Sequence, residues 1–192
     1  MRILSALAVL LLPAGCQATF WAQPPLPAGG CDPAVQGRWY SDVDYPDEGE
    51  SRQVRLNIDA RCQVVATQIL GGAVSYSSSP TSIGMAQLRG QSYVWMNANS
   101  MLTFNGHSHR TQAGDVVVFR YRVEGENLLI WEVNHLHLRN LISSGAIAGG
   151  IDDNEMNEFN RITGPVAPVQ LAAPEFFYEE ATRSLWRSDP GQ

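Results

Sequence analysis

The stretch that most constrains the fold of this chain is residues 101–139, in which apolar and polar side chains alternate. In its middle part Val117, Phe119 and Tyr121 occupy every second position. A period of two is typical of a β-strand that buries one face. Glycine-containing turns interrupt the pattern twice, so it predicts three consecutive antiparallel strands. These strands are expected at residues 101–110, 115–123 and 127–139.

Similar patterns precede this stretch. Val54, Leu56 and Ile58 alternate with polar residues, and after a turn residues 62–70 are expected to return as the second strand of a hairpin. About eight strands at a spacing of 8–12 residues, with no convincing long helix among them, indicate an all-β antiparallel barrel or sandwich. The remaining strands are expected to begin at Gly37 and to cover residues 81–88, 91–97 and 159–162.

The last part of the chain differs in character. Residues 164–173 contain prolines and are expected to form a connector, and residues 174–187 fit one amphipathic C-terminal helix. The acidic run that begins at Asp152 resembles a helix start, because carboxylates are favoured near a helix N-terminus. We therefore expect residues 164–192 to lie outside the β-domain as a connector and a helix.

The motif Gly37-Arg38-Trp39 near the start of the first strand resembles the opening of lipocalin-like (calycin) barrels. The resemblance covers residues 31–163 and implies that Gly37 and Trp39 close one end of the barrel. It also implies a cavity for an apolar ligand, although an eight-stranded barrel can instead be filled by its own side chains. We expect the aromatic residues to fill this one. An unrelated β-sandwich with a core tryptophan is the alternative fold. The aromatic residues concerned are Trp39, Tyr93, Trp95, Phe104, Phe119, Tyr121 and Trp131.

The N-terminus has the layout of an export signal. Arg2 supplies a positive charge, residues 3–12 are apolar, and Pro13-Ala14-Gly15-Cys16 provides a small-residue cleavage region. A cysteine directly after Ala-Gly resembles the lipobox of bacterial lipoproteins. The resemblance implies that residues 1–15 are removed and that Cys16 receives a diacylglyceryl group with chains such as palmitate. Since Gln17 stands where an inner-membrane retention signal usually has aspartate, it also implies the periplasmic face of the outer membrane. An ordinary secretory signal with an unrelated cysteine is the alternative.

Residues 16–30 contain three prolines and a pair of glycines, so we expect a flexible tether between the anchor and the domain. Two cysteines remain after Cys16, and in an oxidising compartment an even remainder usually pairs. We therefore predict a disulfide between Cys31 and Cys62, which would contribute about 3–4 kcal/mol for a loop of this size.

The charge composition excludes several function classes. The net charge of −6 argues against nucleic acid and against an anionic membrane surface as partners. The sequence contains no lysine, which excludes Schiff-base chemistry and the amine of a P-loop.

All four histidines lie within the alternating stretch, as the pairs His107/His109 and His135/His137. On a strand, residues two apart face the same way, so each pair can present two imidazoles side by side. Zinc accepts such ligands. Four histidines on a polar strand face without a metal are the simpler alternative.

These observations favour a non-catalytic binding protein. We expect it to hold a small apolar or amphiphilic ligand, or to bind an envelope protein as an inhibitor or immunity factor would. In the second case the acidic residues 42–50 would meet a basic cleft. A zinc-binding lipoprotein that uses the histidine pairs is the alternative function, and no other cofactor is expected.

Overall fold

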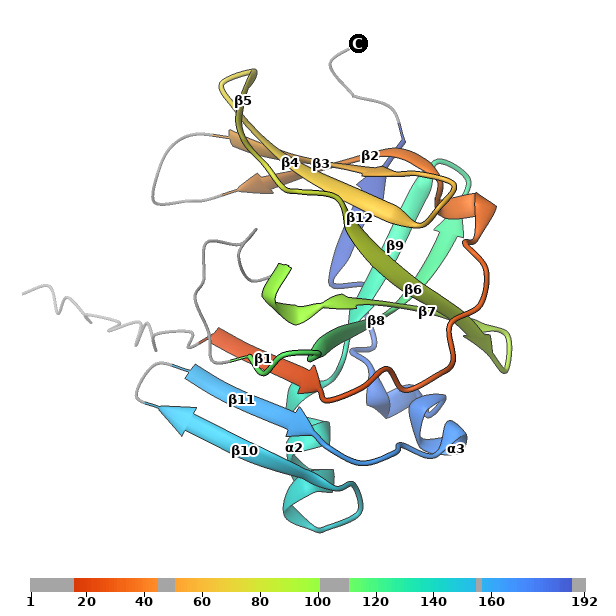
Figure 1. Cartoon of the computed structure of the whole chain (residues 1–192), viewed down its shortest axis with the longest axis vertical. Coiled ribbons are helices and arrows are strands. Elements are labelled where there is room, and N and C mark those ends of the chain that lie inside the picture. The colour runs from red at the N-terminus through yellow and green to blue at the C-terminus, as the bar shows by residue number, and fades with distance from the viewer. Residues whose placement is uncertain (1–15, 45–50, 101–110, 155–156, 188–192) are drawn as a thin grey trace, which may run out of the picture.

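The computed structural model describes residues 16–44, 51–100, 111–154 and 157–187. It is an all-β protein built on a closed antiparallel barrel of eight strands (Figure 1). This architecture is compatible with a lipocalin-like fold. In order around the barrel the strands are β8 (Val116–Glu124), β7 (Gln91–Asn97), β6 (Thr81–Leu88), β4 (Gln63–Leu70), β3 (Ser51–Ile58), β2 (Gly37–Asp44), β12 (Arg183–Trp186) and β9 (Asn127–Glu132), which returns to β8.

Three hairpins of the barrel follow the alternation in the sequence. In β8 and β9, Glu124 pairs with Asn127 across a two-residue turn in which Gly125 has a φ of 58°. That backbone conformation suits glycine. The expected β3–β4 and β6–β7 hairpins are likewise present. The strands predicted at residues 54–58, 62–70, 81–88, 91–97 and 115–123 are therefore confirmed to within a few residues.

The glycine-rich segment after β4 is not a simple loop. Strand β5 (Ala73–Ser77) folds back on β4, and β6 takes over the pairing with β4 further along, at Val64. Between them, Ser78 joins Ala66 by two hydrogen bonds, from its amide nitrogen to the Ala66 carbonyl (2.8 Å) and from the Ala66 amide nitrogen to its Oγ (3.0 Å). The barrel wall is thus continuous where the strands change partner.

The expected C-terminal amphipathic helix is wrong. Residues 174–187 form the 3₁₀ turn η2 (Pro174–Phe176) and strand β12. β12 pairs along β9 from Arg183↔Ile130 to Trp186↔Asn127 and meets β2 at Trp186↔Tyr40. Helix propensity is a weak preference, and pairing with two open strand edges outweighs it here. The last strand therefore closes the barrel.

The expected flexible tether is wrong for its first six residues. Strand β1 (Cys16–Trp21) pairs in parallel with β11 (Asn157–Ile162), and Trp21 also pairs with Val116 of β8. Phe20 and Trp21 are buried, which explains why the segment is ordered. Strand β10 (Gly149–Asn154) completes this smaller sheet beside the barrel (Figure 1). The helix start expected at Asp152 is therefore also wrong. The strand expected at residues 159–162 is present as β11, but it belongs to this smaller sheet and not to the eight-stranded barrel.

The third strand of the alternating stretch ends earlier than predicted. β9 stops at Glu132, and helix α2 (His135–Ser143) begins after Asn134, whose side chain accepts a hydrogen bond from the His137 amide nitrogen (3.1 Å). An asparagine at this position caps the free amide groups of a helix N-terminus. The strand predicted at residues 101–110 lies outside the described residues.

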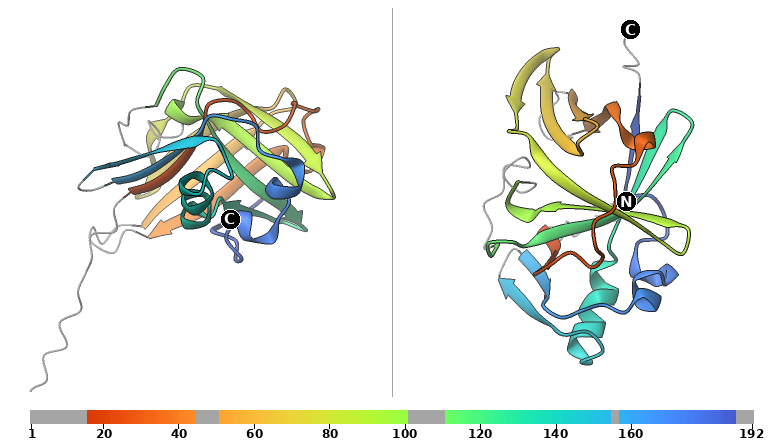
Figure 2. Two further views of the ribbon diagram at one scale, coloured as in Figure 1. Left: turned by 90° about the horizontal axis from the view of Figure 1, so that it is seen from below. Right: turned by 45° about the vertical axis from the view of Figure 1, so that its right-hand side comes forward.

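A second core lies outside the barrel wall. Residues of β7, β8 and β9 pack outward against α2, η2 and the short helix α3 (Pro168–Leu171), which cover one side of the barrel (Figure 2). Buried Asp115, just before β8, is held to Arg161 of β11 by a bidentate ion pair with a shortest distance of 2.8 Å. Of the helices that the structure describes, none has the length and apolar character to span a membrane. The largest members of the outer core are Trp21, Tyr93, Trp95, Trp131, Phe176 and Phe177.

Candidate ligand-binding cavity

A cavity of about 670 Å³ lies inside the barrel and opens at one end, where residues of β1 and of the segment after β9 also line it. On β3, β6 and β9 the lining residues alternate along the strand, as the period of two requires. Much of the lining is aliphatic or sulfur-containing, and ligand sites of proteins commonly have this size and character. Representative lining residues are Leu56, Ile83, Val94, Met96, Leu128 and Ile130.

The floor of the cavity is closed by Trp39 and the 3₁₀ turn η1 (Pro33–Val35). Trp39 is completely buried, and its Nε1 donates a hydrogen bond to the Val35 carbonyl (2.6 Å). Arg187 directly follows β12, and its guanidinium lies 4.6 Å from the centre of the Trp39 ring. The same group donates hydrogen bonds to the carbonyls of Ala34 and Gln36. A cation over an aromatic face is attractive. Trp39, η1 and Arg187 thus contact one another at one end of the barrel.

Gly37 begins the strand that carries Trp39. Its φ of 121° is a conformation that residues with a side chain rarely adopt, and a Cβ there would lie 3.5 Å from Arg187 Nη1. Glycine at this position lets the chain turn out of η1 into β2 beside Arg187.

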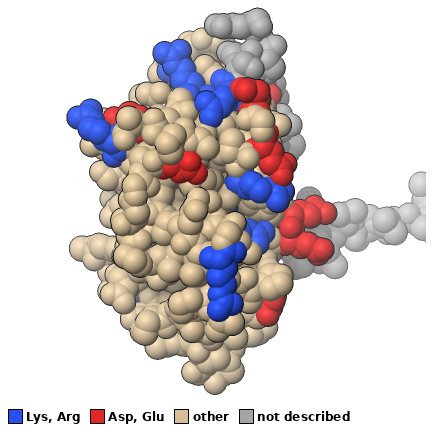
Figure 3. All heavy atoms as spheres, turned by 90° about the vertical axis from the view of Figure 1, so that its right-hand side faces the viewer, with Lys and Arg blue, Asp and Glu red and all other residues tan. Residues whose placement is uncertain are grey.

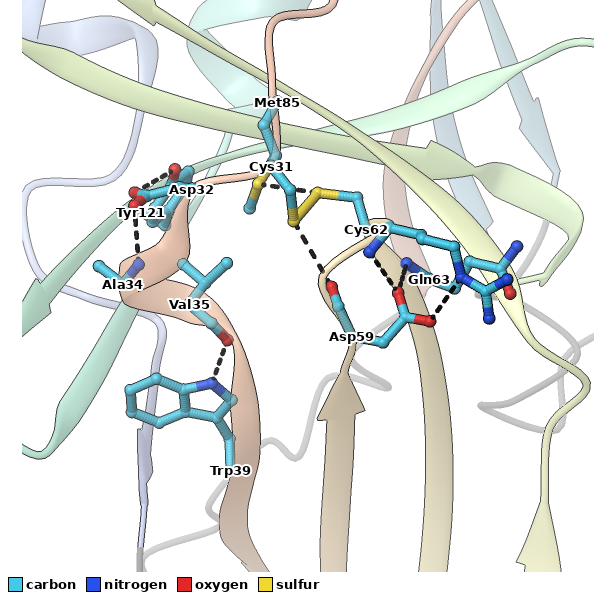
Figure 4. The surroundings of a disulfide bond; sticks show 11 residues. Cys31, Asp32, Ala34, Val35, Trp39, Asp59, Cys62, Gln63, Met85 and Tyr121 are labelled. Atoms are coloured by element: carbon cyan, nitrogen blue, oxygen red, sulfur yellow. Dashed lines mark hydrogen bonds and ion pairs between the residues drawn. A yellow bond between two sulfur atoms is a disulfide. The ribbon is translucent and has the colours of Figure 1, made fainter.

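The disulfide between Cys31 and Cys62 joins the segment before η1 to the β3–β4 turn (Figure 4). The predicted pairing is confirmed, with 5.3 Å between the Cα atoms. Asp59 holds the turn, because its carboxylate accepts hydrogen bonds from the amide nitrogens of Arg61 and Gln63 (2.9 Å each), and the bond from Gln63 is the main cause that lowers the pKa of Asp59. On the other side of η1, Tyr121 donates its hydroxyl to Asp32 (2.9 Å). The floor is thus joined to the β3–β4 turn by the disulfide, to β8 by Tyr121 and to the end of β12 by Arg187.

The opposite end of the cavity is polar and exposed. Glu132 and Arg183 face the cavity from neighbouring strands, with 3.3 Å between Oε1 and Nε, and their side chains are 38 % and 56 % exposed. Gln68 and Ser78 line the wall at the end of β4. An apolar interior with a polar rim suits an amphiphile that buries its tail and leaves its head group at the mouth.

The expectation that aromatic side chains fill the barrel is wrong. Tyr93 and Trp131 belong to the outer core, Trp95 belongs to the outer core and also borders the cavity, and Phe119 and Tyr121 line the cavity. Successive residues of a strand face opposite sides of the wall. Tyr93 of β7 therefore lies on the outer face, whereas Phe119 and Tyr121 of β8 lie on the inner face. Phe104 lies outside the described residues.

The buried cluster around His135 borders the cavity. His135 is 3 % exposed; its Nδ1 lies 3.3 Å from the Thr19 hydroxyl and 3.2 Å from Asn160 Nδ2, and the same amide nitrogen donates to the His135 carbonyl (2.9 Å). Among the described residues its Nε2 has no hydrogen-bond partner, and it lies 3.9 Å from Glu158 Oε2. Burial lowers the pKa of His135, so the imidazole is neutral at pH 7. This cluster fixes α2 to β1 and β11.

The structure changes the basis of the metal hypothesis. His135 and His137 lie in the first turn of α2, where residues two apart do not face the same way, and not on a strand as predicted. His107 and His109 lie outside the described residues. Within the part of the chain that the structure describes, no three or more His, Cys, Asp and Glu side chains are grouped to hold a metal ion.

Two contributors to the cavity were not identified in the sequence. Arg187 stacks on a tryptophan that is far away in the chain, and no local pattern indicates such a contact. Gln17, Ala18 and Thr19 of β1 line the cavity, although the prolines downstream had placed them in a tether. The aromatic pair at Phe20 was the signal that this segment is buried.

Comparisons of the chain with family models, with curated proteins and with solved structures gave no match.

Proposed function

We propose that this protein is a lipid-anchored periplasmic binding protein that holds a small apolar or amphiphilic ligand inside its barrel. The observation that carries the proposal is the cavity of about 670 Å³ with its apolar wall and polar rim. Side chains that line a cavity of this size have few packing contacts on the side that faces it, and a bound apolar ligand would supply such contacts. No catalytic step is included in the proposal.

The anchor is part of the proposal. Its support is the lipobox-like sequence that ends at Cys16, together with the disulfide, which is expected in an exported protein. Acylation of Cys16 would hold the protein on the periplasmic face of the outer membrane, since two acyl chains give stable attachment.

A ligand in the cavity is favoured over a protein docked by charge. The face drawn in Figure 3 carries basic and acidic side chains close to one another. Electrostatic docking onto a basic cleft requires a field of one sign. Of the acidic segment expected to supply it, residues 45–50 lie outside the described residues.

The test is a titration of delipidated protein with cis-parinaric acid, a fluorescent fatty acid. We expect saturable binding of one molecule per chain. Replacement of Ala66, which faces the cavity from β4, by phenylalanine should weaken binding at least tenfold, because the larger ring occupies the space of the ligand.

The matched control is Ser82→Phe, which adds the same ring at an exposed position of β6 that does not line the cavity. This variant should bind like the parent. Equal affinities for the parent and both variants, or the absence of saturable binding, would contradict a ligand inside the barrel. If the protein binds another protein instead of a small ligand, native mass spectrometry of protein extracted from its own membrane would show that partner.

A further inference from the structure

The candidate anchor lies directly at the mouth of the cavity. Cys16 is the first residue of β1 and pairs with Asn157, so no flexible linker separates it from the folded domain. A flexible linker of 15 residues would span about 20 Å on average. By contrast, Thr19 lines the cavity at about 10 Å along the strand from Cys16, since a strand rises about 3.3 Å per residue.

A second feature of the mouth is apolar and exposed. Val74 and Tyr76 of β5 expose 60 % and 37 % of their surface, and Tyr76 also lines the cavity. They are two of the four large hydrophobic residues that are exposed in the described part of the chain. Tyrosine and exposed apolar side chains are favoured at the interface between lipid and water. β5 and the start of β1 thus border the same cavity. The two strands lie apart from each other in the fold (Figure 1).

We propose that the mouth of the barrel docks on the surface of the bilayer that holds the anchor, so that the cavity takes its ligand from the membrane. This rests on the proposed function, because it needs acyl chains at Cys16. The occupant of the docking surface is a zwitterionic bilayer, since a net charge of −6 disfavours an anionic one. The ligand class is then an amphiphile that resides in the bilayer.

The arrangement removes a barrier to transfer. An amphiphile that leaves the bilayer through water must expose its tail, at about 0.8 kcal/mol for each CH₂ group. With the mouth on the bilayer, the tail passes from lipid to the apolar wall while the head group stays beside Glu132 and Arg183.

Two variants with the same chemistry test the orientation. Val74→Trp places a tryptophan on β5 at the mouth, and Val169→Trp places one on α3 away from it; the two valines are 60 % and 59 % exposed. Each full-length acylated protein is reconstituted in vesicles of phosphatidylcholine with brominated acyl chains. The parent protein has five tryptophans. The emission of the added tryptophan is therefore obtained by subtracting the emission of the parent from that of the variant.

We expect bromine to quench at least half of the emission added by Val74→Trp and less than a tenth of that added by Val169→Trp. Equal quenching, or stronger quenching for Val169→Trp, would overturn the proposed orientation. The mass of each sample shows whether Cys16 is acylated. If the mass shows no acyl chains, both the proposed anchor and the proposed orientation are wrong. The fatty-acid titration would still test whether a ligand binds in the cavity.

Discussion

At the scale of single residues, His135 illustrates how burial sets a charge. Desolvation is the main cause that lowers its pKa, and the Arg139 guanidinium acts in the same direction. Glu158 of β11 and Asp153 of β10 act in the opposite direction. Since burial dominates, folding favours the neutral imidazole, and the unfolded chain binds the proton more readily.

This difference predicts a loss of stability in acid. A histidine titrates near pH 6.5 in the unfolded chain. Its contribution is therefore complete above pH 6.5 and is lost as the pH falls toward the lower pKa of the folded state. We expect the free energy of unfolding, measured by urea denaturation, to decrease between pH 7 and pH 5 by up to about 1.4 kcal/mol per pH unit.

His135→Gln is the control, because glutamine is polar and does not titrate. Its free energy of unfolding should be lower at pH 7 but should vary less over the same pH range. A parent protein that is equally stable at pH 5 and pH 7 would speak against a neutral buried imidazole.

The sequence could indicate that His135 and His137 stand close together, but not that they lie on a helix. The alternation continues through Trp131 and Val133, and only Asn134 marks the end of the strand. An asparagine is common in turns, caps and loops alike, so the start of α2 depends on packing against β1 and β11, which are distant in the chain.

At the scale of elements, the disulfide connects the segment before η1 to the β3–β4 turn across the floor of the barrel. These two parts also share a core cluster, because Val35 of η1 and Ile58 at the end of β3 both belong to it. The covalent link therefore limits mainly how far the unfolded chain can spread.

We predict that reduction with dithiothreitol lowers the free energy of unfolding by about 3–4 kcal/mol, the value expected for a loop of this length. Denaturation curves with and without the reductant measure it. The double variant Cys31→Ala/Cys62→Ala should be destabilised by a similar amount and should not respond to dithiothreitol. If the parent does not respond either, the disulfide has no such role.

The hairpins were predictable because each one combines alternation with a nearby turn. β1 and β12 have neither a clear alternation nor a turn that leads directly to a partner strand. Their partners β11, β9 and β2 lie far away in sequence. The apolar residues at Leu185 and Trp186 fit a helix face as well as a strand, and only the open edges of the barrel decide between them. Local pattern therefore predicted most of the wall but not its closure.

At the scale of the whole molecule, closure of the barrel depends on its last strand. β12 meets β2 at one residue pair, Trp186↔Tyr40, and Arg187 adds a hydrogen bond to Ala34, which is 153 residues earlier in the chain. Contacts between such distant residues carry a large entropic cost, because a long loop must close to form them.

A chain that stops after Thr182 should fail to close. We expect it to lose the near-ultraviolet circular dichroism of packed aromatic residues and to bind the dye ANS, as partly packed states do. A chain that stops after Arg187 keeps β12 and the Trp39 contact and should behave like the parent. Native dichroism in the shorter chain would show that β12 is dispensable.

The existence of a barrel was predictable from the spacing of its strands, but its hollow interior was not. Alternation assigns residues to two faces of a wall and does not say which face is inside. Here Tyr93, Trp95 and Trp131 are packed on the outer face.

That outer packing has a consequence for how the molecule can work. Tyr93 and Trp131 obtain their contacts in the outer core, together with residues of α2, α3 and η2, and not in the cavity. Under the proposed function, release of a ligand from the cavity would leave these contacts in place. The barrel is then expected to keep its shape through repeated binding and release without unfolding.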